Sequence, residues 1–232
     1  MSKAAAIEMT RKLTAEGGPL DYGPEQSGLM LRVLRAVAAG QPVCRRAVDG
    51  IALELGMTPD DAWPFLGQLT ERNPHGDIVG ILGLSLNQHR HRFSIKEVQL
   101  STWCALDTLF LPSLLGQPAV VESPSPVSQE LVRVVVGPAG VEKVSPAGAV
   151  VSIVVVDAER ANMRSVEDIW TSFCRHIHFF ASREEAEHWA AGRRDIAILS
   201  VAEGYEVGEV CVKRLLTSGT ERTTCSAPPA NR

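Results

Sequence analysis

The sequence lacks the patterns by which several classes of protein are recognised. Its cysteines are odd in number and contain no C-x-x-C pair, and they stand at positions 44, 104, 174, 211 and 225. Scattered cysteines are typical neither of a disulfide framework nor of a zinc ribbon. No apolar run is long enough to cross a bilayer, and charged residues interrupt the N-terminal stretch where a secretory signal would lie. We therefore expect a cytoplasmic protein with free thiols and no membrane partner.

An excess of basic residues is also missing. The chain has 23 Lys and Arg against 27 Asp and Glu, which gives a formal net charge of -4. Proteins that bind nucleic acid usually carry excess positive charge, because their cations displace the counterions of the phosphates. The composition therefore predicts no nucleic-acid partner. The hydrophobic content of 45% predicts a well-developed buried core.

The first part of the chain is predicted to be helical. Residues 1–26 form a predicted arm, with a helix over about 4–15 followed by the loop EGGPLDYGPEQ. Residues 27–95 predict three helices, over about 29–38, over about 45–55, and from Thr58, where Pro59 favours a helix start. The run DIVGILGLSLNQHRHRFSI alternates like two strands around Asn87–His89, which would form a wing. This part resembles a winged helix-turn-helix domain.

The second part, residues 96–216, is predicted to be a catalytic α/β domain. Its β-branched runs, such as LVRVVVG and AVVSIVVV, are separated by Pro, Gly and Ser, and SREEAEHWAAGR is an amphipathic helix. The predicted fold class is α+β, with a winged-helix-like helical half followed by a compact mixed or antiparallel sheet and packed helices. Residues 217–232 are polar and aperiodic, which predicts a disordered tail.

The segment LSTWCALDTLFLP places an ionisable acid near a thiol in apolar surroundings. If it is helical, Cys104 and Asp107 stand at i and i+3 and share one face. The carboxylate could then accept a thiol proton or deliver one. The alternative is that Cys104 is a buried apolar residue and that Asp107 bonds a nearby backbone group. Spacing alone favours this alternative.

The segment TSFCRHIHFFAS is predicted to be a strand. Its alternation would place Cys174, His176 and His178 on one side, where thiolate and imidazole could bind zinc or copper. A structural zinc site would need a fourth ligand, and no further motif supplies one. Buried histidines that bond neighbouring backbone are an equally good interpretation.

Taken together, WCALDTLF-P and the later SFC-x-H-x-HFFAS resemble the organomercurial lyase (alkylmercury lyase) family of bacterial mercury resistance. The resemblance extends over VSPAGAVVSIVV and the helix before AILSV. It implies that Cys104 and Cys174 bind mercury and that Asp107 carries the proton. It further implies organomercurial substrates, no organic cofactor and no permanently bound metal. Small cytosolic thiols are implied as partners, and a mercuric reductase is implied to accept the Hg(II) product.

The chain departs from the family pattern in its accessory cysteines. Family members often have a cysteine shortly after the first motif, where this chain has VVESPSP, and some have one at the position of Arg175. These departures bear on stability and rate more than on the reaction. Trp103 could lie against the organic group or the metal, although a core aromatic is the more ordinary role. Cys44 and Cys211 are predicted to pack in apolar segments, and Cys225 lies in the predicted tail.

Two further functions compete with the lyase. A soft-metal-responsive winged-helix regulator would use the cysteines as a sensor, but Asp60 and Asp61 at the start of its third helix would repel DNA phosphate. A passive copper or zinc carrier would use Cys174, His176 and His178. Protonolysis of a carbon–mercury bond is the leading hypothesis, because it gives both the thiols and the acid a task.

Overall fold

The computed structural model describes residues 1–157 and 161–220. The helices are α1 (Lys3–Thr14), α2 (Gly23–Val37), α3 (Arg45–Glu54), α4 (Pro59–Leu69), α5 (Ala105–Leu115), α6 (Val166–Ser172), α7 (Arg183–Trp189) and α8 (Val201–Thr220), with a 3-10 turn, η2, at Cys174–His176. The strands are β1 (Thr70–Arg72), β2 (Ile78–Ile81), β3 (Leu84–Ser85), β4 (His91–Ile95), β5 (Val98–Thr102), β6 (Ala119–Pro124), β7 (Leu131–Gly137), β8 (Gly140–Ser145), β9 (Val150–Val154), β10 (Phe179–Phe180) and β11 (Ile196–Ser200). This arrangement confirms the predicted α+β class.

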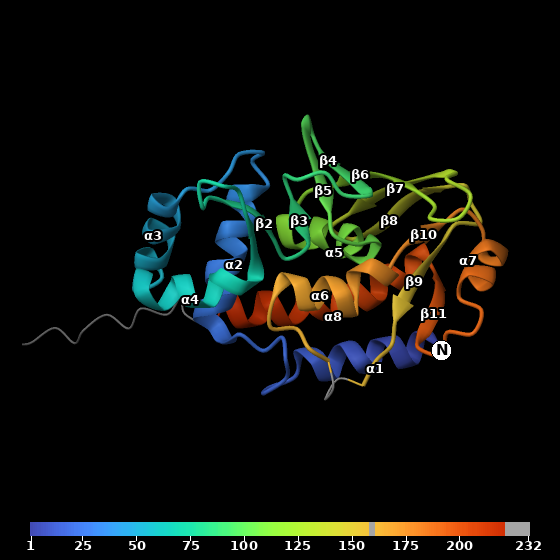
Figure 1. The fold of residues 1–232 in the computed structure, drawn as a ribbon, viewed down its shortest axis with the longest axis horizontal. Coiled ribbons are helices and arrows are strands. Elements are labelled where there is room, and N and C mark those ends of the chain that lie inside the picture. Colours follow the sequence, from blue (N-terminus) through green and yellow to red (C-terminus); the bar gives the residue numbers. More distant parts are fainter. Residues whose placement is uncertain (158–160, 221–232) are drawn as a thin grey trace, which may run out of the picture.

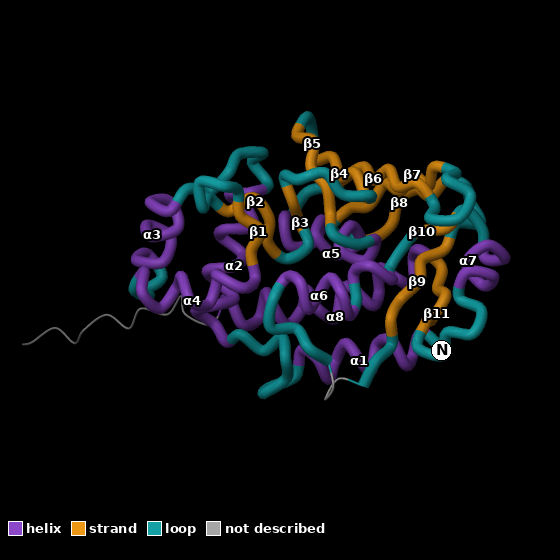
Figure 2. The backbone as a smooth tube through the Cα atoms, viewed as in Figure 1, coloured by secondary structure: helices purple, strands orange, loops and turns teal. Residues whose placement is uncertain are grey.

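The strands form two separate antiparallel sheets (Figure 2). The larger has the order β1-β2-β3-β5-β4-β6-β7-β8, and the smaller has the order β10-β9-β11. The larger sheet runs from Thr70 to Ser145 and so continues through residues 95 and 96, where the sequence predicted a division into two parts. Val-rich strands such as β7 and β9 alternate or bury their side chains as expected for sheets packed on a core.

Helix α8 is the central helix of the core. It packs against α1, α2 and α5, so it lies between the N-terminal helices and the helix that follows β5 (Figure 1). No helix within the described ranges is both long and apolar enough to cross a membrane. α8 extends to Thr220, past residue 217, where the sequence predicted the tail to begin. Residues 221–232, which include Cys225, lie outside the described residues.

The predicted N-terminal helices are confirmed. Thr58 caps α4 by accepting a hydrogen bond from the backbone N–H of Asp61 at 3.2 Å, and Pro59 is its first residue. α2 begins at Gly23, earlier than the predicted start at Leu29. The predicted hairpin around Asn87–His89 is wrong, because β5 lies between β3 and β4 in the sheet.

The tight turns explain the error. Hairpins form instead at Leu82–Gly83, between β2 and β3, and at Lys96, between β4 and β5, where the backbone adopts positive φ angles. The segment between β3 and β4 is a loop whose polar side chains bond a single acid: Asn87 donates to Glu71 at 2.8 Å and His89 lies 3.1 Å from it. Alternating apolar residues predicted the strands but could not identify which of them pair.

Candidate active site

Cys104 lies at the junction between β5 and α5. The strand ends at Thr102, and Cys104 has an extended backbone as the N-cap of α5, so the predicted continuous helix begins only at Ala105. The Asp107 carboxylate accepts a hydrogen bond from the backbone N–H of Cys104 at 2.7 Å, while the Cys104 sulfur accepts from the Asp107 backbone N–H. The pair therefore forms a capping box, in which a thiol replaces the usual hydroxyl.

Cys174 comes from a different element. It begins η2, directly after α6, and the predicted strand over 171–182 is wrong except for Phe179–Phe180. Ser152 of β9 fixes the segment, because its hydroxyl donates to the His176 carbonyl at 2.8 Å and accepts from the His178 N–H at 2.9 Å. The backbone N–H of Ala105 donates to the Ile177 carbonyl at 3.2 Å, which joins this segment to the start of α5.

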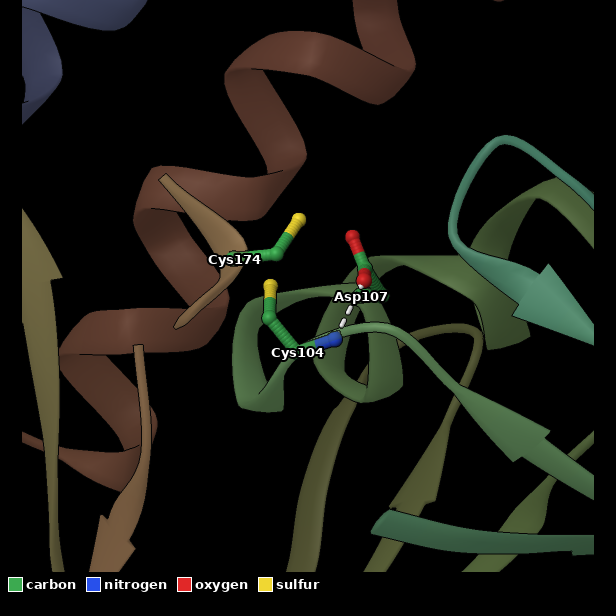
Figure 3. A group of neighbouring side chains, drawn as sticks. All are labelled: Cys104, Asp107 and Cys174. Carbon is green, nitrogen blue, oxygen red and sulfur yellow. Dashed lines mark hydrogen bonds between the residues drawn. The ribbon is translucent and has the colours of Figure 1, made fainter. Parts of the chain in front are cut away.

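The fold brings Cys104, Asp107 and Cys174 together. One sulfur or oxygen atom from each lies within 4.8 Å of the others. The residues are 2%, 7% and 4% exposed, respectively. Figure 3 shows the two sulfurs facing one another beside the carboxylate, with the thiol of Cys174 approaching from a separate segment. This arrangement confirms that the two motifs meet in space.

Burial controls the protonation of this group. Removal from water raises the pKa of Asp107 to about 7, although hydrogen bonds from the backbone and side chain of Cys104 oppose the change. Burial also raises the pKa of the Cys104 thiol well above its ordinary value, and its hydrogen bond with Cys174 and the Asp107 charge add to this effect. For Cys174, the hydrogen bond from Cys104 lowers the pKa, but burial and Asp107 raise it overall. The resting site therefore favours neutral thiols beside a carboxyl that titrates near neutrality.

Gly83 makes room for the Asp107 carboxyl. A Cβ atom at this position would lie 2.3 Å from Cγ of Asp107, and the backbone of Gly83 has a φ of 86°. The Gly83 carbonyl also accepts a hydrogen bond from the Trp103 N–H at 2.8 Å. The turn between β2 and β3 thus contacts the acid directly, which the sequence did not indicate. The only signal was a glycine in the otherwise apolar run ILGL.

The group opens into an apolar cavity of about 150 Å³. Side chains from α1, α2, α5, α6 and α8 line it, including Met9, Leu13, Met30, Leu106, Phe110, Ile169, Phe173, Cys211 and Leu215. Trp103 is 4% exposed and also lines the cavity. The lining can hold an apolar group against the thiols and excludes bulk water from the carboxyl.

The two histidines of the second motif do not join Cys174. His178 donates from Nε2 to the Arg175 carbonyl at 2.9 Å, and His176 Nδ1 faces Arg193 at 3.4 Å. Burial lowers the pKa of His178 to about 4. Within the part of the chain that the structure describes, the group able to hold a metal contains Cys104, Asp107 and Cys174 without either histidine. The predicted C-x-H-x-H face is therefore wrong, because η2 breaks the alternation that it required.

Comparisons with known proteins identify the family of this chain. The model of the family described as MerB, alkylmercury lyase, matches residues 84–213, which contain all three residues of the group. The chain is 38% identical to an alkylmercury lyase of Streptomyces lividans, covering 83% of this chain and 86% of that protein. It is 31% identical to an alkylmercury lyase of Bacillus cereus, covering 96% and 98%.

A solved structure has the same fold. The crystal structure of the mercury-bound form of MerB2 superposes with a TM-score of 0.71, covers 91% of this chain and 99% of its own, and is 22% identical. At that identity the likeness concerns the fold alone. The family model and the relatives go further, because they match the sequence over most of its length. This chain belongs to the alkylmercury lyase family.

Proposed function

We propose that this enzyme cleaves the carbon–mercury bond of organomercurials by protonolysis and releases a hydrocarbon and Hg(II), as a step in mercury detoxification. The observation that carries the proposal is the meeting of two thiols and a buried carboxyl in one apolar cavity. Membership of the alkylmercury lyase family supports the reaction class.

Capture of the substrate is the task of the thiols. Mercury(II) is a soft cation that prefers thiolate sulfur, so Cys104 and Cys174 would replace a small thiol R′S– on R–Hg–SR′. The first cysteine gives its proton to the departing R′S–, which leaves as R′SH. The second cysteine then binds mercury and gives its proton to the Asp107 carboxylate, which lies beside both sulfurs. Donation from two sulfurs weakens the bond between mercury and carbon.

Protonation of carbon is the task of Asp107. The proton taken from the second thiol passes from the carboxyl to the departing carbon as the carbon–mercury bond breaks. Mercury stays Hg(II), bound to two sulfurs, and Asp107 returns to a carboxylate, so charge and protons balance. A general acid works best when its pKa lies near the working pH, and burial places that of Asp107 at about 7.

Trp103 would contact the organic group. It lines the cavity next to Cys104 and is nearly fully buried, so its ring offers an apolar surface to an alkyl or aryl substituent. The reaction written above requires no organic cofactor and no resident metal, because mercury enters as substrate and leaves as product.

We place the enzyme in a reducing cytoplasm, where small thiols deliver the organomercurial and accept the product, and where a mercuric reductase consumes Hg(II). Free Cys104 and Cys174 support this placement, since oxidation of two sulfurs so close together would disable capture. Membrane and nucleic acid have no role in the proposal.

The N-terminal arm, residues 1–26, and the helices that follow it would act as a cover for the catalytic part, residues 96–216. Met9 and Leu13 of α1 and Met30 of α2 close one side of the cavity. Asp60 and Asp61 are exposed at the start of α4, where they would repel DNA phosphate. A metal-responsive regulator is therefore the weaker alternative, and salt-sensitive, sequence-dependent binding to duplex DNA would favour it.

The experiment that tests the function uses a phenylmercury salt with excess small thiol. Benzene in the headspace is the expected product, at a rate proportional to the enzyme. The control is the full-length protein with both Cys104→Ser and Cys174→Ser, which retains the exposed Cys44. Absence of benzene from the parent protein, or equal benzene from the control, would reject the proposal.

A further inference from the structure

A third thiol lines the active-site cavity. The sequence predicted that Cys211 packs in the core, but its side chain keeps accessible surface and borders the same free space as Cys104, Asp107 and Cys174. Cys44, in contrast, is exposed at the start of α3 and does not line the cavity. Of these two cysteines, only Cys211 lies at the active-site cavity.

The packing of α8 fixes this position. A Cβ atom at Gly204 would lie 2.6 Å from Val151 Cγ1, and one at Gly208 would lie 3.0 Å from Phe110 Cβ, so both glycines let α8 approach its neighbours closely. Cys211 follows Gly208 by three residues and therefore lies on the same side of the helix. Phe110 also lines the cavity, so the contact between α8 and α5 directs Cys211 toward the catalytic group.

The cavity extends from the catalytic group toward the outer surface. Cys211 and Tyr22 both line it, together with Cys104, Asp107 and Cys174. Tyr22 lines both the cavity and a wider hollow of about 940 Å³ that opens to the outside. Leu69 and Met163 also line both spaces, so the two are adjacent.

An independent observation points to a ligand in the cavity. Trp103 is 4% exposed, and its indole Nε1–H has no hydrogen-bond partner among the residues that the structure describes. A buried donor without an acceptor is costly, and a bound acceptor would satisfy it. A mercury-bound thiolate is such an acceptor, and the cavity that Trp103 lines contains three thiols.

We propose that Cys211 is a third mercury ligand, which takes Hg(II) from the catalytic thiols after cleavage and passes it toward the outer hollow. The inference rests on the proposed function. In the exchange, a bond forms between mercury and Cys211 sulfur while the bond to Cys174 sulfur breaks. The Cys211 proton moves to Cys174 through the Asp107 carboxylate. Mercury remains Hg(II) throughout, so no oxidant or reductant takes part.

The test uses mercury without an organic group, so it does not depend on the lyase reaction. The full-length protein is loaded with one equivalent of mercuric chloride and mixed with excess dithiothreitol. Loss of the ultraviolet absorption of the protein's mercury–thiolate bonds is followed by stopped flow. Cys211→Ser should slow the transfer by about tenfold or more, because it removes a ligand held close to the metal. The matched control, Cys44→Ser, should transfer mercury at the parental rate.

A second variant and a second readout keep the test decisive. Cys211→Ala should show the same slowing as Cys211→Ser, and circular dichroism identifies any variant that fails to fold. In the protein with Cys104→Ser and Cys174→Ser, loading with mercury should protect Cys211 from alkylation, as read by peptide mass spectrometry. Parental or faster transfer in folded Cys211 variants, or unprotected Cys211, would overturn the inference. If the parent releases benzene from phenylmercury but these results fail, only the inference is lost; if it releases none, the proposed function is lost.

Discussion

The two segments that supply the catalytic thiols differ in how they are held. Cys104 and Asp107 begin α5, a helix in which most residues are buried and which packs against α8. Cys174 follows α6, a fully described helix with no buried residue, and depends on a short 3-10 turn. Segments that bury little apolar surface open at lower free-energy cost. Phe173 and Ile177, which flank Cys174, are themselves buried, so the difference lies in the exposed α6 that precedes them. We therefore expect the acid and one thiol to form the more rigid unit and the second thiol to adjust to mercury through movement of α6.

The largest expected effect is on the thiols themselves. Cys104→Ser and Cys174→Ser should each nearly abolish hydrocarbon release, because a single sulfur leaves mercury with a stronger bond to carbon. The measurement is the single-turnover rate with phenylmercury, with Cys44→Ser as a control that retains the parental rate. Substantial turnover in either variant would show that the two segments do not act together.

Burial of Asp107 in the rigid segment should also make the stability of the protein depend on pH. Because burial raises the pKa of Asp107 from 3.8 to about 7, the folded state retains a proton that the unfolded state loses between these pH values. Stability should therefore fall as pH rises from about 4 to about 7 and level off above, by up to about 4 kcal/mol.

Asp107→Asn should remove this dependence, because the amide does not titrate. Urea unfolding of both proteins at a series of pH values measures it, and the difference between them isolates Asp107 from the other titrating groups. Parallel curves for the two proteins would mean that Asp107 is ionised in the folded state.

Gly83 offers a way to disturb the rigid segment alone. Gly83→Ala should displace the Asp107 carboxyl, and a displacement of about 1 Å in a catalytic group costs about 10²-fold in rate. Gly76→Ala is the matched control, since Gly76 has a φ of 85° against 86° and no atom within 4 Å of an added Cβ. Both variants carry the same backbone strain. Equal turnover rates in Gly83→Ala and Gly76→Ala would therefore show that Gly83 does not position the Asp107 carboxyl.

The smallest effect is expected from the second segment. Ser152→Ala removes both hydrogen bonds of the Ser152 hydroxyl, to the His176 carbonyl and from the His178 N–H, and we expect a loss of about 1–2 kcal/mol in stability. The backbone N–H of Ser152 still donates to the His178 carbonyl. Turnover should fall less than in Gly83→Ala, because Cys174 can still reach mercury. Thermal unfolding and single-turnover rates test this. A rate loss larger than that of Gly83→Ala would reverse the assignment of rigid and adjustable segments.

Much of the site was readable from the sequence because its chemistry is local. The spacing of Cys104 and Asp107 placed them together whether the segment was helical or a cap, since i and i+3 also define a capping box. The helix start at Thr58 was predicted for the same reason, because caps depend on adjacent residues. Cys174 was joined to them only by the resemblance to a known family.

The remaining features depend on contacts between distant segments. Nothing near Cys174 in the sequence marks a 3-10 turn, because the segment is held by hydrogen bonds with the distant residues Ser152 and Ala105. Gly83 matters only because Asp107 lies against it, and Cys211 faces the cavity only because α8 packs on α5. Apolar periodicity reports that a residue is turned inward, but it does not report whether protein or free space lies there.

The central claim is that Asp107 delivers the proton to carbon. Asp107→Asn keeps the shape of the side chain and both thiols, so it should still bind phenylmercury but lose about 10²–10⁴-fold in turnover. Mass spectrometry of the intact variant, sampled over time after mixing, is the most direct measurement. We predict that a protein–mercury–phenyl adduct accumulates, whereas the parent protein proceeds to benzene and bound Hg(II). Release of benzene by the variant at the parental rate, without such an adduct, would contradict the account.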